Sequence, residues 1–284
     1  MAKTKWNLLF TTFILSCVSL TALIVSLCTP FWLTSEAYEL SAFKNSEINY
    51  GLFSGSLTQN FLPNPRYYDL TLTCLYQEYV CAFSCQHDEE SRADEVLKLL
   101  RGLRPADCPV RSSKMLEVVQ DPAIHGMDRQ ISIDFDRSSF INTGLWVSTV
   151  VFIGIATSFA AVSASFSIIN VLFNPIEPVF NVFGLFIWNG VAIGATALCM
   201  IMWGTLFAGT LNDNIAITDT LTTQIPYTSS GLAVLGVSYW VLFLPIVLHG
   251  LNIGLLLWRR YIINKEPPLT TIDVDRSDLT IIMF

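Results

Sequence analysis

The chain has 284 residues, of which 52% are hydrophobic and 14% are charged, and its mean hydropathy is +0.51. This composition is too apolar for a soluble domain of that length and indicates a membrane protein. The formal net charge of -7 argues against nucleic-acid binding, which requires a basic surface.

Four stretches are long enough to cross a membrane and contain no Asp, Glu, Lys or Arg: residues 7–32, 144–173, 182–209 and 230–258. A hydrocarbon core of about 30 Å takes about 20 apolar residues per helix. Because lipid offers the backbone no hydrogen-bond partner, each stretch must be helical. The sequence therefore predicts an all-α transmembrane fold, a four-helix bundle with a small extracellular β-sheet module.

Basic residues predict the orientation of this bundle. Lys3 and Lys5 lie in the N-terminal segment 1–6, and Arg259 and Arg260 directly follow the fourth span. Lys and Arg favour the cytoplasmic side, so we expect both termini in the cytoplasm. A cleaved signal peptide is the alternative for the N-terminus, but the first apolar run is longer than a usual signal-peptide core.

The connections between the spans follow from this orientation. They are a first extracellular loop at 33–143, a cytoplasmic turn at 174–181, a second extracellular loop at 210–229 and a cytoplasmic tail at 259–284. Trp6 and Trp32 are expected at the inner and outer membrane interfaces of the first span, where aromatic residues gather.

The first extracellular loop is expected to fold as strands and a helix. Residues 48–57 and 67–76 are rich in aromatic and β-branched residues, and 130–135 alternates apolar with polar residues, so each predicts a strand. Ser91 and Asp94 are expected to cap a short amphipathic helix. Its apolar residues, Val96, Leu99, Leu100 and Leu103, are expected to pack on the sheet.

Four cysteines lie in the same loop: Cys74, Cys81, Cys85 and Cys108. An even number of cysteines in an extracellular compartment predicts two disulfides, for which three pairings are possible. A zinc site formed by Cys81, Cys85, His87 and Cys108 is the alternative, although their spacing fits no common zinc finger. No cofactor is expected.

The third and fourth spans contain polar and small residues. Gly190 and Gly194 form a G-x-x-x-G pattern, which allows a neighbouring helix to approach closely. We expect this approach within the bundle, with dimerisation as the alternative, and we expect Asn189 to hydrogen-bond across the seam. In the fourth span we expect His249 to make a structural hydrogen bond rather than transfer protons, and Pro245 to kink the helix.

The four-span pattern with a large first outer loop resembles the claudin-like tetraspan superfamily, although Phe53 stands where claudins have tryptophan. A closer resemblance is to the clarin family. Its Tyr-Gly-Leu-Phe-x-Gly element is matched by Tyr50, Gly51, Leu52, Phe53 and Gly55, and its third-span pattern by Trp188 and Asn189. The outer loop is longer than in clarins and contains no Asn-x-Ser/Thr sequon. Both glycines of the element are expected where a Cβ would be obstructed.

This resemblance implies a multi-pass plasma-membrane protein. It would act as a non-enzymatic adaptor or organiser of channel, adhesion or sensory components, in mechanotransduction, in actin-rich protrusions or at synapses. A claudin-like junction barrier or paracellular pore and an auxiliary subunit of an ion channel are the alternatives. The absence of charged residues inside the spans weighs against an ion pathway. The sequence shows no nucleophile paired with a base and no phosphate-binding loop, so an enzyme is not expected.

The C-terminal tail ends in the apolar sequence Thr-Ile-Ile-Met-Phe. Ile282 and Phe284 lie on one face if this segment is extended, which is the pattern of a ligand that adds a strand to a PDZ domain. A cytoplasmic PDZ scaffold is therefore an expected partner. The alternative is that the apolar tail rests on the lipid bilayer surface.

Overall fold

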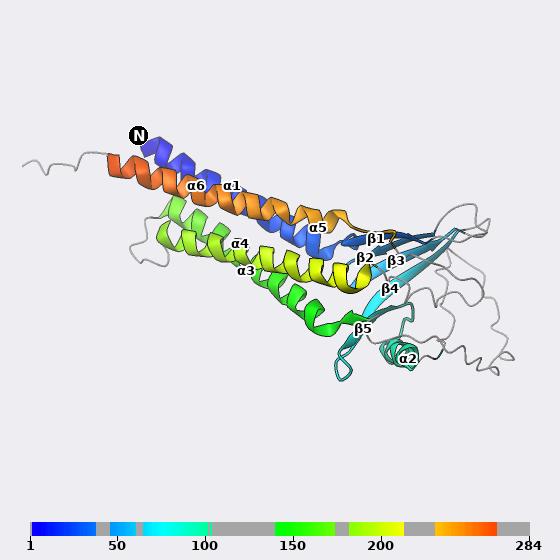
Figure 1. Cartoon of the computed structure of the whole chain (residues 1–284). Coiled ribbons are helices and arrows are strands. Elements are labelled where there is room, and N and C mark those ends of the chain that lie inside the picture. The colour runs from blue at the N-terminus through cyan, green and yellow to red at the C-terminus, as the bar shows by residue number, and fades with distance from the viewer. Residues whose placement is uncertain are drawn as a thin grey trace, which may run out of the picture.

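The computed structural model describes residues 2–37, 46–60, 65–101, 103, 140–173, 182–212 and 231–265. Four long helices run side by side, and a β-sheet extends from one end of their bundle (Figure 1). The helices are long and apolar enough to cross a membrane over Trp6–Cys28, Thr143–Leu172, Val182–Leu211 and Val237–Lys265. The predicted multi-pass bundle with a small sheet is confirmed at this level.

The helices have the following bounds: α1 Ala2–Cys28, α2 Glu89–Leu100, α3 Thr143–Leu172, α4 Val182–Leu206, α5 Val237–Val241 and α6 Phe243–Lys265. α4 continues in a π-helical turn, η3 (Phe207–Leu211). The fourth span is interrupted at Leu242, between α5 and α6. Pro245 explains the interruption, because it has no N–H to bond the carbonyl of Val241.

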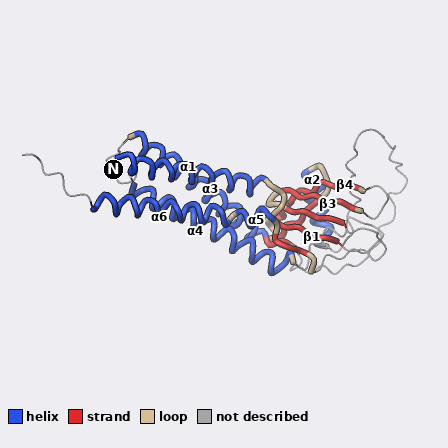
Figure 2. Tube along the Cα trace, turned by 90° about the horizontal axis from the view of Figure 1, so that it is seen from above, coloured by secondary structure: helices blue, strands red, loops and turns tan. Residues whose placement is uncertain are grey.

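Within the described residues, the sheet contains seven strands in the order β6-β5-β4-β3-β2-β1-β7, and all neighbours are antiparallel. Seen from above, the sheet lies at one end of the helices (Figure 2). The strands are β1 Leu33–Ala37, β2 Ser46–Tyr50, β3 Ser54–Gln59, β4 Arg66–Leu75, β5 Val80–Ser84, β6 Ile141–Asn142 and β7 Ala233–Leu235. β1 closely follows α1, β6 runs directly into α3, and β7 leads into α5. β6 and β7 thus lead into helices with at most one residue between, whereas residues 29–32 separate α1 from β1.

Two spans are shorter at the sheet end than the sequence predicted. α1 ends at Cys28 rather than at residue 32, since a residue that precedes proline is disfavoured in a helix and Thr29 precedes Pro30. Residues 233–235, predicted to lie in the fourth span, instead form β7 and pair with β1. Lipid would not satisfy backbone groups in this extended conformation, but the neighbouring strand does.

The predicted strand 48–57 is wrong as a single strand, because it is the hairpin of β2 and β3. Gly51 turns the chain between them, and its N–H donates to the Ser54 carbonyl at 2.8 Å. The predicted strand 67–76 corresponds to β4, while 130–135 lies outside the described residues. β5 was not predicted: all 5 of its residues are buried, so it lacks the alternation by which half-buried strands are recognised.

α2 packs on the sheet as predicted, but its cap differs from the prediction. The Asp88 carboxylate accepts a hydrogen bond from the Ser91 N–H at 3.2 Å, so Asp88 rather than Ser91 is the N-cap. Asp94 lies inside the helix. Val96 and Leu99 are buried in a cluster with residues of β5.

One hydrophobic core extends from the sheet into the bundle. Its largest buried side chains come from strands and helices alike, among them Tyr50, Ile48, Leu70, Leu23, Ile153 and Trp203. Because the sheet and the helices share this core, the sheet cannot swing independently of the bundle without exposing apolar surface to water.

Candidate functional site at the junction of sheet and bundle

The Tyr50 to Gly55 element lies where the β2–β3 hairpin meets the helices. The Tyr50 ring is buried and stacks on Phe83 of β5, with a centroid distance of 4.1 Å. Leu52 is buried as well, and its carbonyl accepts a hydrogen bond from Trp146 Nε1 of α3 at 2.8 Å. Phe53 is 45% exposed and presents an edge-to-face contact to Trp146. The element therefore anchors the hairpin on α3.

The two glycines of this element occupy close approaches, which confirms the prediction. A Cβ on Gly51 would lie 2.8 Å from Pro30 Cα at the end of α1. A Cβ on Gly55 would lie 2.6 Å from the Asn49 carbonyl oxygen. Since these neighbours are backbone atoms, they cannot move aside as a flexible side chain would. Gly51 brings the hairpin against α1.

Trp32 is buried, with 0% exposure, so the prediction of an interfacial residue is wrong. Its ring meets Trp203 of α4 edge to face at 5.2 Å. Its backbone N–H donates to the Tyr50 carbonyl, and its carbonyl accepts from the Gly236 N–H, both at 2.9 Å. The chain has already turned into the sheet at this residue, so Trp32 joins β2, β7 and α4 instead of facing lipid.

Cys74 and Cys81 form a disulfide. They lie opposite each other in the β4–β5 pair, so the bond fastens two neighbouring strands. Cys85 is also disulfide-bonded, and Cys108 lies outside the described residues. The bond between Cys74 and Cys81 removes Cys81 from the alternative zinc set.

Glu95 of α2 is a buried carboxyl group that the sequence did not single out. Its side chain is 4% exposed and accepts a hydrogen bond from Ser84 Oγ of β5. Burial raises the pKa of Glu95, against the smaller effects of the Ser84 hydrogen bond and the Lys98 charge, which lower it. Glu95 lies outside the four apolar helices, between the sheet and α2.

A hydrogen-bonded network joins the four long helices near the middle of the bundle. Asn189 Oδ1 of α4 lies 2.6 Å from His249 Nδ1 and 3.2 Å from Asn252 Nδ2, both of α6. Asn252 Nδ2 also donates to Ser16 Oγ of α1 at 2.9 Å, and Ser16 Oγ lies 3.2 Å from Ser163 Oγ of α3. All five side chains are buried. The predicted hydrogen bonds of Asn189 and His249 are confirmed.

The expected packing of Gly190 and Gly194 inside the bundle is wrong. Both residues are exposed, and a Cβ built on either glycine meets no atom within 4 Å. The reason is the rotation of α4: Asn189 points into the polar network, so the residue that follows it faces outward. Trp188 packs beside Phe159 and Phe166 of α3, with ring centroids 5.6 Å and 6.1 Å away.

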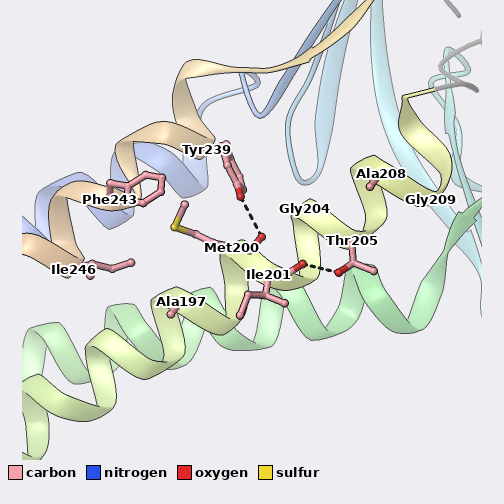
Figure 3. Close-up of a pocket in the computed structure, with 10 residues that line it drawn as sticks. All are labelled: Ala197, Met200, Ile201, Gly204, Thr205, Ala208, Gly209, Tyr239, Phe243 and Ile246. Carbon is pink, nitrogen blue, oxygen red and sulfur yellow. Dashed lines mark hydrogen bonds between the residues drawn. The ribbon is translucent and has the colours of Figure 1, made fainter. Parts of the chain in front are cut away.

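An apolar groove of about 790 Å³ lies between α4 and the α5–α6 segment (Figure 3). Small residues of α4 and η3, such as Ala197, Gly204 and Ala208, form one wall, and Phe243 belongs to the other. The Tyr239 hydroxyl donates to the Met200 carbonyl at 3.4 Å across it. Its walls offer apolar contact rather than polar chemistry.

The remaining predicted site residues, Ile282 and Phe284, lie outside the described residues. No known protein-family model matches the chain, and no curated protein matches it.

Proposed function

We propose that the chain is a clarin-like, non-enzymatic tetraspan protein of the plasma membrane that organises a complex of channel, adhesion or sensory components. The observation that carries this proposal is the rigid junction. β6 and β7 lead into helices, β1 follows α1 after four residues, and one core includes Trp32, Tyr50 and Trp203. A surface fixed in this way to the membrane suits a static scaffold, because a partner bound to the sheet is held at a set height and angle.

Basic residues support an orientation with the sheet outside the cell. Arg259 and Arg260 lie on α6 at the end of the bundle away from the sheet, where α1 also begins (Figure 1). Lys3 and Lys5 belong to the first turns of α1. The positive-inside rule puts this end in the cytoplasm. The disulfide between Cys74 and Cys81 suits the oxidising extracellular side.

The outward face of α4 supports lateral association with another membrane helix. Gly190 and Gly194 are open toward the lipid, and a G-x-x-x-G face allows two helices to approach closely. Gly250 and Gly254 repeat the same spacing on α6 and are open as well. The tail, with Ile282 and Phe284, adds a PDZ-type contact on the cytoplasmic side.

Affinity capture of the full chain from native membranes tests this proposal. The wild type is compared with G194L, which fills the open face of α4, and with a chain extended by one glycine after Phe284. G154L is the matched control, because Gly154 is exposed on α3 and also has no neighbour within 4 Å. We expect G194L to lose membrane partners, the extended chain to lose cytoplasmic scaffolds, and G154L to lose neither.

A second measurement distinguishes the organiser from the claudin-like alternative. The full chain is expressed in an epithelial monolayer, and transepithelial resistance and ion selectivity are recorded. An organiser should leave both unchanged. A changed paracellular conductance, together with identical partner sets for the wild type and G194L, contradicts the proposed function and favours a barrier or pore.

A further inference from the structure

The end of the bundle away from the sheet contains a second cavity, of about 400 Å³, between α4 and α6. It is lined by Val182, Phe183, Phe186, Arg259, Arg260 and Ile263. The cavity therefore combines an apolar wall from the first turns of α4 with two arginines from the last turns of α6. It shares none of its lining with the groove near the sheet.

The two arginines have no counter-charge in the described part of the chain. Arg259 Nε is buried and has no hydrogen-bond partner, and no ion pair joins either guanidinium group to another described residue. Every described Asp and Glu lies within 36–95, in the sheet, the turn between β4 and β5, or α2 and its N-cap. A buried polar donor without a partner costs free energy, and Arg259, whose Nε is such a donor, also lines the cavity.

The chemistry of the cavity selects an anion. A guanidinium group presents parallel N–H donors that match two oxygens of a phosphate, and two adjacent arginines add their charges. α4 begins at Val182, so the positive end of its helix dipole also faces this region. Both contributions favour a phosphate group over a neutral ligand.

The surroundings place this anion at the level of lipid headgroups. Trp258 and Tyr261 are 60% and 58% exposed beside the arginines, and exposed aromatic residues of membrane helices gather at the membrane interface. Phe183, at 60% exposure, continues the apolar wall toward the lipid. A soluble phosphate would leave this wall uncovered, whereas the glycerol and upper acyl carbons of a phospholipid would cover it.

We propose that the cavity binds the headgroup of an anionic phospholipid, with Arg259 and Arg260 on the phosphate and with Phe183 and Phe186 against the glycerol and acyl carbons. This site is independent of the proposed partners, because it uses only residues of α4 and α6. Lipid bound there would hold the start of α4 against the end of α6. Anionic lipids are concentrated in the cytoplasmic leaflet, which agrees with the orientation proposed above.

The test measures lipid retained by the purified full chain. The protein in detergent receives an equimolar mixture of phosphatidylcholine, phosphatidylserine and phosphatidylinositol 4,5-bisphosphate, and native mass spectrometry counts each adduct. We expect anionic lipids to be retained at least about tenfold better than phosphatidylcholine, which corresponds to one charge-assisted contact. We expect excess inorganic phosphate to displace little lipid.

Three variants locate the site. R259Q/R260Q should reduce anionic-lipid adducts about tenfold. R259K/R260K should reduce them less, because lysine keeps the positive charge but lacks the paired N–H donors of a guanidinium group. K265Q is the matched control: Lys265 is a cation on the same helix, with its Nζ over the Tyr261 ring rather than in the cavity. It should retain lipid as the wild type does.

The outcomes that overturn the proposal are equal retention of phosphatidylcholine and anionic lipids, undiminished binding by the arginine variants, or an equal loss in K265Q. Displacement by inorganic phosphate alone would also overturn it. If R259Q/R260Q does not fold, the headgroup preference of the wild type and the lipid retention of R259K/R260K still test the proposal. None of these measurements requires a partner protein, so their failure is distinct from failure of the proposed organising function.

Discussion

The junction of sheet and bundle and the middle of the bundle both hold together segments that are far apart in the sequence, but they use different chemistry. At the junction, Gly51 lets one backbone lie against another, and Trp32 fills the space between strands and helices. In the middle of the bundle, Asn189 hydrogen-bonds to both His249 and Asn252, and Asn252 also hydrogen-bonds to Ser16.

The solvent explains the difference. Lipid is as apolar as a leucine side chain, so apolar burial does little to bring membrane helices together, and polar contacts and close packing must do more of it. Near the sheet, water is close enough for burial of aromatic surface to be favourable. The junction should therefore fail when volume is added, and the middle of the bundle should weaken when a hydrogen bond is removed.

Gly51→Val tests the junction and has the largest expected effect. Its Cβ would stand 2.8 Å from Pro30 Cα and 3.0 Å from two carbonyl oxygens. The hairpin must move away from α1 to remove this steric overlap. We expect the free energy of unfolding to fall by about 3 kcal/mol, the upper end of the range for overpacking. Surface biotinylation should find the variant retained inside the cell.

Gly194→Val is the control for this prediction. It adds the same side chain to a position where no atom lies within 4 Å, so the chain should fold and reach the surface. Equal surface delivery of Gly51→Val and Gly194→Val would contradict the claim that the junction depends on a close backbone approach.

Cys74→Ser tests the covalent part of the sheet. The bond to Cys81 closes a short loop between adjacent strands, for which we expect a contribution of about 2 kcal/mol. Peptide mapping without reductant should recover the two cysteines in one linked fragment, and the variant should unfold at a lower temperature. Free thiols at both positions of the wild type would refute this pairing.

The sequence predicted the features that depend on composition. The predictions failed for features that are determined by contacts with neighbouring elements. The four membrane helices follow from apolar length alone, and Asn189 and His249 were expected to hydrogen-bond because polar groups in lipid need partners. β5 was missed, since a fully buried strand has no polar alternation. β7 was missed because its apolar residues look like the start of a span until their pairing with β1 is known.

Helix rotation is the other property that local sequence does not determine. Gly190 and Gly194 match a packing motif, yet they face outward because Asn189, on the same helix, turns toward His249. Glu95 went unnoticed for a related reason: its burial depends on the contact of α2 with Ser84 of β5 rather than on its own helix.

A double-mutant cycle tests the middle of the bundle. Asn189→Leu and His249→Leu each remove one partner of the 2.6 Å contact. Hydrogen bonds between membrane helices contribute about 1 kcal/mol, so we expect a coupling of that size between the two substitutions. Thermal unfolding in detergent gives the stabilities of the wild type, the two single variants and the double variant. Ser165→Ala is the control, because the exposed Ser165 hydroxyl bonds only its own helix. Additive losses would show that the contact between Asn189 and His249 does not couple α4 to α6.

Glu95 gives the smallest expected effect and the only one that depends on pH. Burial raises its pKa above the ordinary value of 4.5, so the folded chain binds the proton more tightly than the unfolded chain does. This contribution to stability is present in full below 4.5 and is lost as the pH rises through the raised pKa.

Glu95→Gln removes the titration while keeping an oxygen that accepts from Ser84 Oγ. At neutral pH we expect Glu95→Gln to unfold at a slightly higher temperature than the wild type, and the difference should shrink as the pH falls toward 4.5. A difference for Glu95→Gln that stays constant over this interval would mean that its carboxyl group is charged in the folded chain.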